Sequence, residues 1–229
     1  MPDFTLALDI YGTLVDPLEM DEHLREFAGD EASAVSALWR QKQLEYTFRR
    51  GLMRSYTDFG TVTAQALKFA FDTFGLELQE EQRATLISEY QNLRAFPDVS
   101  PGLKKLREAG FDAVAFSNGV EKTTRKLLTN AGIIGLLDDV VSVDDVQTFK
   151  PAPEVYRHLC NELGLSAEQI CLVSSNPFDV IGAKKSGLKA TWLQRSPSAI
   201  FDPWDVPPDF IATDLEDLII TLTSVQPST

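Results

Sequence analysis

Cysteine, histidine and basic residues are all scarce in this chain. Its 229 residues include two cysteines and two histidines, and 21 lysines and arginines stand against 34 acidic residues, for a formal net charge of −13. Cys160 and Cys171 lie in segments typical of a helix and a strand, which favours buried thiols over a disulfide. Without a basic stripe, we expect no nucleic-acid partner. An anionic substrate would have to be attracted by a few local cations.

Long hydrophobic runs are also missing. The apolar runs are no longer than a strand, so none predicts a membrane span. The start Met-Pro-Asp-Phe lacks the basic region and cleavage site of a signal peptide, and we expect a cytoplasmic protein. No Ser-His-Asp, zinc or dinucleotide-binding pattern occurs at usable spacing. The length and the 44% hydrophobic content are enough for one large domain, or for a core with a smaller insert.

Strand-like and helix-like segments alternate through most of the chain. Apolar runs typical of strands occupy residues 4–9, 111–116, 140–143, 169–173 and 189–193. Helical patterns lie between them at residues 102–109, 122–131, 153–163 and 180–186. This order predicts an α/β fold, a Rossmann-like three-layer core with a central parallel sheet.

A helical segment interrupts the alternation directly after the first strand. Amphipathic patterns at residues 31–49, 57–74 and 80–93 predict helices there. We therefore expect a core domain of residues 1–15 and 98–223 and a helical cap domain of residues 16–97. The polar residues 224–229 are predicted to be a disordered tail.

Polar residues cluster where the predicted strands end. The clusters are Asp9 to Thr13, Ser117 to Gly119 and Ser174 to Asp179, and a fourth, residues 149–153, follows the short strand. Ligands of parallel α/β sheets bind at the carboxyl ends of the strands. The inserted helices can cover these ends as a lid.

The clusters resemble the four ordered motifs of the haloacid dehalogenase superfamily, over residues 5 to about 195. The matching stretches are Asp9-Ile-Tyr-Gly-Thr-Leu, Ser117-Asn-Gly, Lys150-Pro-Ala-Pro and Ser174-Ser-Asn-Pro-Phe-Asp179. Most members are magnesium-dependent phosphatases, but this chain departs from them twice. Tyr11 replaces the Asp that protonates a leaving alkoxide, a proton that a halide does not need. Ser174-Ser175 replaces a Gly-Asp pair whose Asp holds magnesium.

Both departures favour the L-2-haloacid dehalogenase branch. The resemblance then implies that Asp9 attacks C2 of a short L-2-haloacid and forms an ester, which water hydrolyses to the D-2-hydroxy acid. The expected partners are the haloacid anion and water, with no metal, no cofactor and no membrane, and the protein is a possible homodimer. The alternatives are a phosphatase or phosphonate hydrolase of the same superfamily, or a catalytically silent binding protein that kept the fold.

The resemblance also implies other site residues. Arg40 lies in a stretch similar to the lid helix of the dehalogenase subgroup, and it would receive the halide. Its apolar stem could instead cover apolar surface, Asp179 could also cap a helix, and Ser117-Asn-Gly could simply be a turn. Tyr11 and Tyr156 could be core tyrosines. The predicted catalytic residues are Asp9, Thr13, Arg40, Lys150, Ser174, Asn176 and Asp179. The predicted substrate-binding residues are Tyr11, Arg40, Leu44, Phe59, Ser117, Asn118, Tyr156 and Phe178.

Overall fold

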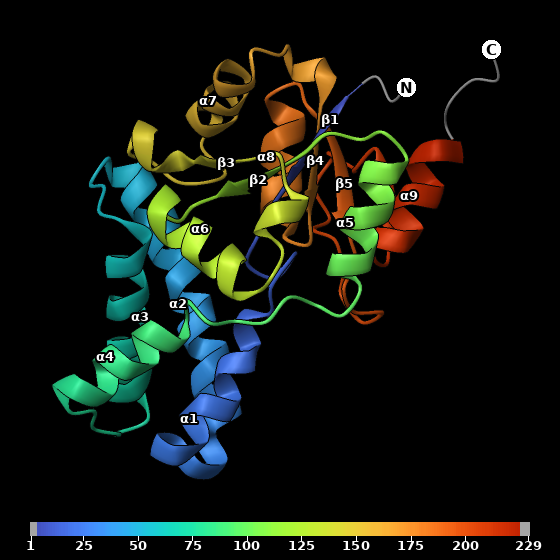
Figure 1. The fold of residues 1–229 in the computed structure, drawn as a ribbon. Helices are drawn as coiled ribbons and strands as arrows, with labels where there is room; N and C mark the ends of the chain where they lie inside the picture. Colours follow the sequence, from blue (N-terminus) through green and yellow to red (C-terminus); the bar gives the residue numbers. More distant parts are fainter. Residues whose placement is uncertain (1–3, 225–229) are drawn as a thin grey trace.

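A sheet of six parallel strands forms the centre of the computed structural model, which describes residues 4–224 (Figure 1). The strand order is β3-β2-β1-β4-β5-β6. Because β1 has β2 on one side and β4 on the other, the chain reverses its direction of winding beside β1. The strands are β1 (Thr5–Leu8), β2 (Ala113–Ser117), β3 (Asp139–Ser142), β4 (Ile170–Ser174), β5 (Lys189–Leu193) and β6 (Phe210–Ala212).

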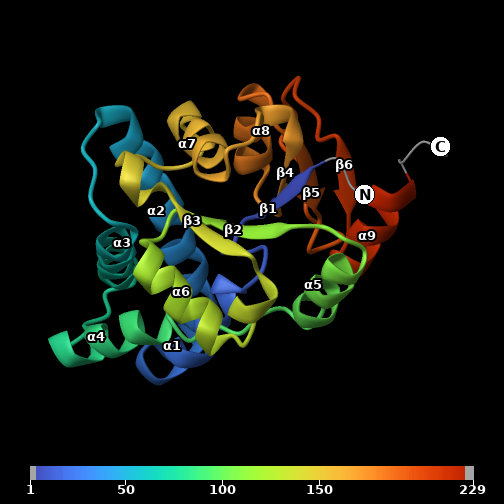
Figure 2. The same ribbon diagram turned by 45° about the horizontal axis from the view of Figure 1, so that its top comes forward.

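Both faces of the sheet are buried, which explains why the strands are continuous apolar runs. Successive side chains alternate between the faces, so Leu6 and Leu8 join one hydrophobic cluster and Ala7 joins the other. Figure 2 shows the helices that cover the two sides. The cluster of Leu6 includes α5 (Val99–Glu108), α6 (Glu121–Asn130) and α9 (Leu215–Ser224), and that of Ala7 includes α7 (Pro153–Leu163) and α8 (Pro177–Lys185).

Four helices stand between β1 and α5 and project from one end of the sheet (Figure 1). They are α1 (Met20–Ala28), α2 (Ala32–Met53), α3 (Phe59–Thr73) and α4 (Glu80–Glu89). The longest, α2, packs against both α1 and α3. Trp39 of α2 is buried, and its indole N–H donates to the backbone oxygen of Thr63 in α3 at 2.8 Å. These contacts fix which face of α2 is directed toward the sheet.

The predicted parallel sheet and inserted helices are confirmed, with several differences. Helix α1 (Met20–Ala28) was not predicted as a separate helix. The first inserted helix predicted, residues 31–49, extends to Met53. Strand β6 was not predicted, because its three residues are too few for an alternation to be recognised. Helix α9 was not predicted either, although Leu215, Leu218 and Leu222 have helical spacing and are buried. Short 3₁₀ turns occupy Pro17–Glu19, Gly29–Glu31, Ile134–Leu136, Val143–Val146 and Ala167–Gln169.

Ser224, the first residue of the predicted tail, ends α9, and the rest of that tail lies outside the described residues. Within residues 4–224 no helix combines the length and the apolar character needed to cross a membrane.

Candidate active site

The polar loops that follow β1 and β4 meet at one edge of the sheet. The N–H of Asp9 donates to the backbone oxygen of Val173 at 3.0 Å, which holds the two strand ends side by side. After Asp9 the chain turns sharply, with Gly12 at φ +87°. A Cβ on Gly12 would stand 3.2 Å from the Ser175 hydroxyl, so the close approach of the two loops favours glycine.

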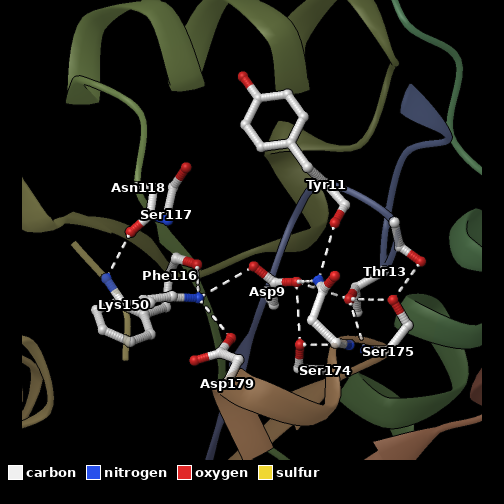
Figure 3. A network of polar contacts seen from close by, with 12 residues as sticks. Asp9, Tyr11, Thr13, Phe116, Ser117, Asn118, Lys150, Ser174, Ser175 and Asp179 are labelled. Carbon is white, nitrogen blue, oxygen red and sulfur yellow. Dashed lines mark hydrogen bonds and ion pairs between the residues drawn. The ribbon is translucent and has the colours of Figure 1, made fainter. Parts of the chain in front are cut away.

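The two oxygens of Asp9 have different partners (Figure 3). Its Oδ2 accepts three hydrogen bonds, from the Thr13 hydroxyl at 2.8 Å, the Ser174 hydroxyl at 3.1 Å and the Asn176 amide at 2.7 Å. Its Oδ1 accepts from Lys150 Nζ at 3.0 Å, and residues 4–224 supply no second donor. Oδ2 is therefore saturated, whereas Oδ1 keeps a lone pair for another partner.

Lys150 is a buried cation between two buried carboxylates. Its side chain is 1% exposed, and Nζ lies 3.0 Å from Asp9 Oδ1 and 2.8 Å from Asp179 Oδ2. A third hydrogen bond, 2.8 Å long, runs to the backbone oxygen of Phe116. All three ammonium donors are thus used, which offsets the cost of removing the charge from water.

Burial and mutual charge shift the pKa values of this triad in different directions. Burial alone would raise the pKa of Asp9, but the Lys150 ammonium and the Thr13 hydrogen bond hold it below its ordinary value. Burial, together with the charge of Asp9, raises the pKa of Asp179. Burial opposes the charge of Lys150, but the two carboxylates raise its pKa above the ordinary value. At neutral pH, Asp9 is therefore a carboxylate and Lys150 an ammonium.

Tyr156 lies beneath the site and not on its wall. It is fully buried, and its hydroxyl donates to Asp179 Oδ1 at 2.7 Å. Burial raises its pKa well above the ordinary value, so the phenol remains a hydrogen-bond donor. Asp179 is held between Tyr156 and Lys150, so Tyr156 positions Asp179, and its substrate contact stays a prediction.

Arg40 reaches the site from α2. Its Nη2 donates to the backbone oxygen of Tyr11 at 3.2 Å, and its Nη1 donates to Gln43 Oε1 at 2.6 Å. Gln43 is fully buried, accepts a second hydrogen bond from the Tyr90 hydroxyl at 3.1 Å and donates to Thr63 at 2.6 Å. The guanidinium is thus fixed by a buried polar network. Its charge also contributes to lowering the pKa of Asp9.

The other side chains predicted to bind substrate include Tyr11, Phe59, Phe178 and Leu44. The ring of Tyr11 points away from the Asp9 carboxylate (Figure 3) and packs on buried Phe59, with ring centroids 5.2 Å apart. Phe178 packs edge-on against Phe48 of α2 at 5.0 Å. Leu44 is half-buried on α2, one helical turn after Arg40.

Ser117 ends β2 and Asn118 follows it, beside the triad. Ser117 Oγ accepts from the N–H of Gly119 at 2.9 Å, and Asn118 Oδ1 accepts from the N–H of Lys150 at 2.9 Å. Within the described chain, neither the Ser117 hydroxyl proton nor the Asn118 amide group donates to a protein acceptor. Both are therefore available for an anionic ligand.

Two residues without a predicted role hold the loops in place. The Ser175 hydroxyl donates to the backbone oxygen of Gly12 at 2.6 Å. Arg195, after β5, donates to the backbone oxygen of Thr13 from Nε at 3.1 Å and Nη2 at 2.6 Å, and Nη1 donates to Asp98 at 2.6 Å. The motif that contains Ser175 does not predict this contact, and no sequence pattern identifies Arg195, because each residue acts on a backbone oxygen distant in the chain.

The donor set does not fit a magnesium ion. Asp179 is already bonded to Lys150 and Tyr156, and Ser175 offers a hydroxyl that is bonded to Gly12. Magnesium requires a near-octahedral set of oxygens that usually includes carboxylates. In the part of the chain that the structure describes, no three His, Cys, Asp or Glu side chains gather as metal ligands.

Comparisons with known proteins identify similar chains. The family model for haloacid dehalogenase-like hydrolases matches residues 5–187. The chain is 35% identical over 221 residues to (S)-2-haloacid dehalogenase 4A of Burkholderia cepacia, covering 96% of this chain and 92% of that protein. It is 36% identical over 220 residues to haloacetate dehalogenase H-2 of Moraxella sp. (strain B), covering 96% and 97%.

A solved structure is similar over the whole length. It is L-2-haloacid dehalogenase from Xanthobacter autotrophicus with chloropropionic acid covalently bound, with a TM-score of 0.90 and 30% identity, covering 99% of this chain and all of that one (100%).

Proposed function

The chain belongs to the haloacid dehalogenase-like hydrolases, and from this membership and the geometry of its site we propose that it hydrolyses short L-2-haloacids to D-2-hydroxy acids. One observation carries the proposal: the carboxylate of Asp9 is ionised, buried and held by four donors, with one oxygen left to react. A carboxylate fixed in this way is suited to form an ester with carbon.

In the first step, Oδ1 of Asp9 attacks C2 from the side opposite the halogen. The new Oδ1–C2 bond forms as the carbon–halogen bond breaks, and the electron pair leaves with the halide. Attack from this side inverts the configuration at C2. The Ser117 hydroxyl and the Asn118 amide would hold the carboxylate of the substrate, since both are hydrogen-bond donors beside the triad.

In the second step, water attacks Cγ of Asp9. Negative charge then develops on Oδ2, which Thr13, Ser174 and Asn176 already surround as donors at 2.7–3.1 Å. Donors fixed in advance around such an oxygen stabilise the transition state. The Cγ–Oδ1 bond breaks, and Lys150, 3.0 Å from Oδ1, supplies a proton to the departing hydroxy acid.

Lys150 and Asp179 complete the proton balance of this step. Asp179 lies 2.8 Å from Lys150 Nζ and holds the amine beside Asp9, so the amine can take up the proton of the attacking water after it has given its own to the hydroxy acid. Each turnover releases one halide and one proton. Attack on Cγ leaves C2 untouched, so the inversion made in the first step is kept.

Arg40 is proposed to receive the departing halide, because its guanidinium is fixed by hydrogen bonds to Gln43 and Tyr11 and its charge acts on Asp9. We expect Arg40→Ala to lower kcat by about 10²–10³-fold, the usual cost of removing a group that stabilises developing charge. The matched control is Lys42→Ala on the same helix, because the Lys42 ammonium pairs with Glu45 at 2.6 Å. That variant should stay within about twofold of wild type. Equal losses in steady-state kinetics would mean that Arg40 serves only the packing of α2.

A phosphatase reaction is disfavoured by the same geometry. A phosphoryl group carries more charge than a haloacid and needs a metal ion, which this donor set does not fit. The side chain of Tyr11 occupies the place of the expected general acid and points away from Asp9 (Figure 3).

The experiment that tests the proposed function is halide release from L- and D-2-chloropropionate by the purified protein in excess EDTA. Release from the L form alone, undiminished by EDTA, is expected. Release that requires magnesium, or hydrolysis of a generic phosphate ester in place of the haloacid, would contradict the proposal and favour a phosphatase.

The assembly of the enzyme also belongs to this proposal. Residues 16–97 would act as a cap over the core formed by residues 1–15 and 98–223, since Arg40 reaches the site from α2.

A cytoplasmic location fits the sequence, and a homodimer fits the family resemblance. Size-exclusion chromatography with light scattering measures the number of subunits.

A further inference from the structure

An apolar groove opens beside the triad, between α2 and the core. It has a volume of about 580 Å³, within the range of small-molecule pockets. Apart from Thr47, Lys150 and Asp202, its lining is glycine, proline or apolar side chain. The lining residues are Thr47, Phe48, Gly51, Leu52, Phe149, Lys150, Pro151, Ala152, Pro153, Phe178, Asp202 and Trp204.

We propose that this groove binds the alkyl tail of longer 2-haloacids, so that the enzyme accepts substrates well beyond the three-carbon acids. This inference rests on the proposed function and names its substrate class. The groove borders the active site, because Lys150 and Phe178 line it and Lys150 Nζ contacts Asp9.

Helix α2 leads from the reacting centre into the groove. Arg40, Leu44, Thr47 and Gly51 follow one another at spacings of four, three and four residues, so they lie on one face of the helix. Arg40 contacts the loop after Asp9 through the backbone oxygen of Tyr11, and Thr47 and Gly51 line the groove. Eleven residues of helix span about 16 Å, which is long enough to accompany an extended tail of several methylene groups.

Gly51 leaves the space that a tail would fill. Glycine inside a helix costs about 1 kcal/mol relative to alanine, so its presence in α2 weakens the helix. A Cβ there would meet only the Thr148 hydroxyl, at the ordinary contact distance of 3.6 Å. Larger side chains are therefore tolerated by the backbone but would project into the groove.

The outer end of the groove is exposed and apolar. Leu52 is 87% exposed and Trp204 is 66% exposed, and both line the groove. An alkyl chain that reached them would cover apolar surface that water now contacts. Burial of one methylene changes an equilibrium constant by up to a factor of about four. Each added carbon should therefore raise kcat/KM until the tail extends beyond the groove.

The test compares L-2-bromopropionate with L-2-bromohexanoate. For the wild-type protein we expect kcat/KM for the hexanoate to exceed that for the propionate by about tenfold, since three added methylenes are partly buried. Gly51→Leu should remove this preference, whereas Met53→Ala should retain it, because Met53 is 66% exposed and lies outside the groove. Thermal midpoints check that both variants fold.

Unhalogenated acids give a second measurement that requires no turnover. Hexanoate should inhibit hydrolysis of L-2-bromopropionate competitively and about tenfold more strongly than propionate does, and Gly51→Leu should abolish the difference. A wild-type preference for the short acid, or a preference that Gly51→Leu leaves intact, would overturn the groove assignment. Failure to hydrolyse L-2-bromopropionate at all would instead overturn the proposed function.

Discussion

Asp9→Asn is expected to lower halide release by at least about 10⁴-fold, the scale of losing a nucleophile. The amide has no anionic oxygen to attack C2, yet it keeps the size and most hydrogen bonds of the carboxylate. Circular dichroism and thermal melting should show that the variant folds. Rapid-quench mass spectrometry should find the substrate-derived ester on wild-type Asp9 and none on the variant.

The result must be obtained with protein free of deamidation, because conversion of the introduced Asn to Asp restores the nucleophile. Steady halide release by pure Asp9→Asn would rule out Asp9 as the attacking group. The matched control is Asp16→Asn, because Asp16 is a carboxylate in the same segment whose side chain accepts a hydrogen bond from the N–H of Leu18. This control should retain activity.

Lys150→Met is expected to destabilise the fold by about 3–5 kcal/mol, because it leaves Asp9 and Asp179 buried without their shared cation. Urea denaturation measures the free energy of unfolding. Activity should be lost as well, since the leaving hydroxy acid loses its proton donor. A loss below about 1 kcal/mol would mean that the carboxylates do not depend on Lys150.

The pH dependence of the lost stability distinguishes the loss of a charge interaction from the loss of packing. Without Lys150, both carboxylates have raised pKa values in the folded protein, so the native state holds protons more tightly than the unfolded chain. Their protonation then favours folding, and the deficit should be smaller near about pH 5 than near about pH 8. A deficit that does not change with pH would indicate lost packing against Phe116.

The double variant Lys150→Met/Asp179→Asn keeps this prediction testable if the single variant does not fold. Removing one of the two carboxylates reduces the uncompensated charge, so the double variant should be more stable than Lys150→Met. If the losses of unfolding free energy caused by Lys150→Met and by Asp179→Asn simply add in the double variant, Lys150 and Asp179 are not energetically coupled despite their 2.8 Å contact.

The core of the fold could be predicted because the pattern that identifies each strand lies within a few consecutive residues. Strands buried on both faces are apolar runs, and each ends in a polar cluster that must lie at the same edge of a parallel sheet. Asp9, Ser117 and Ser174 were placed in this way. Strand β6 has only three residues, and its pairing with β5 depends on the tertiary fold.

The supporting network of the site was harder to predict because its partners are distant in the chain. Gln43 connects Arg40 with Tyr90 and Thr63, and no spacing in the sequence distinguishes it from an exposed glutamine. The sequence leaves Tyr156 as either a substrate contact or a core tyrosine. Its hydroxyl donates to Asp179, which is visible only once α7 and α8 are packed together.

The most direct test of the central claim is a single-turnover hydrolysis of L-2-chloropropionate in ¹⁸O-labelled water with enzyme in excess. If Oδ1 of Asp9 attacks C2 and water then attacks Cγ, the label enters the side chain of Asp9, and the lactate carries an unlabelled oxygen. Mass spectrometry of the peptide that contains Asp9 and of the product measures both. Label in the lactate with none on Asp9 would show that water displaces the halide directly, and would contradict the covalent mechanism.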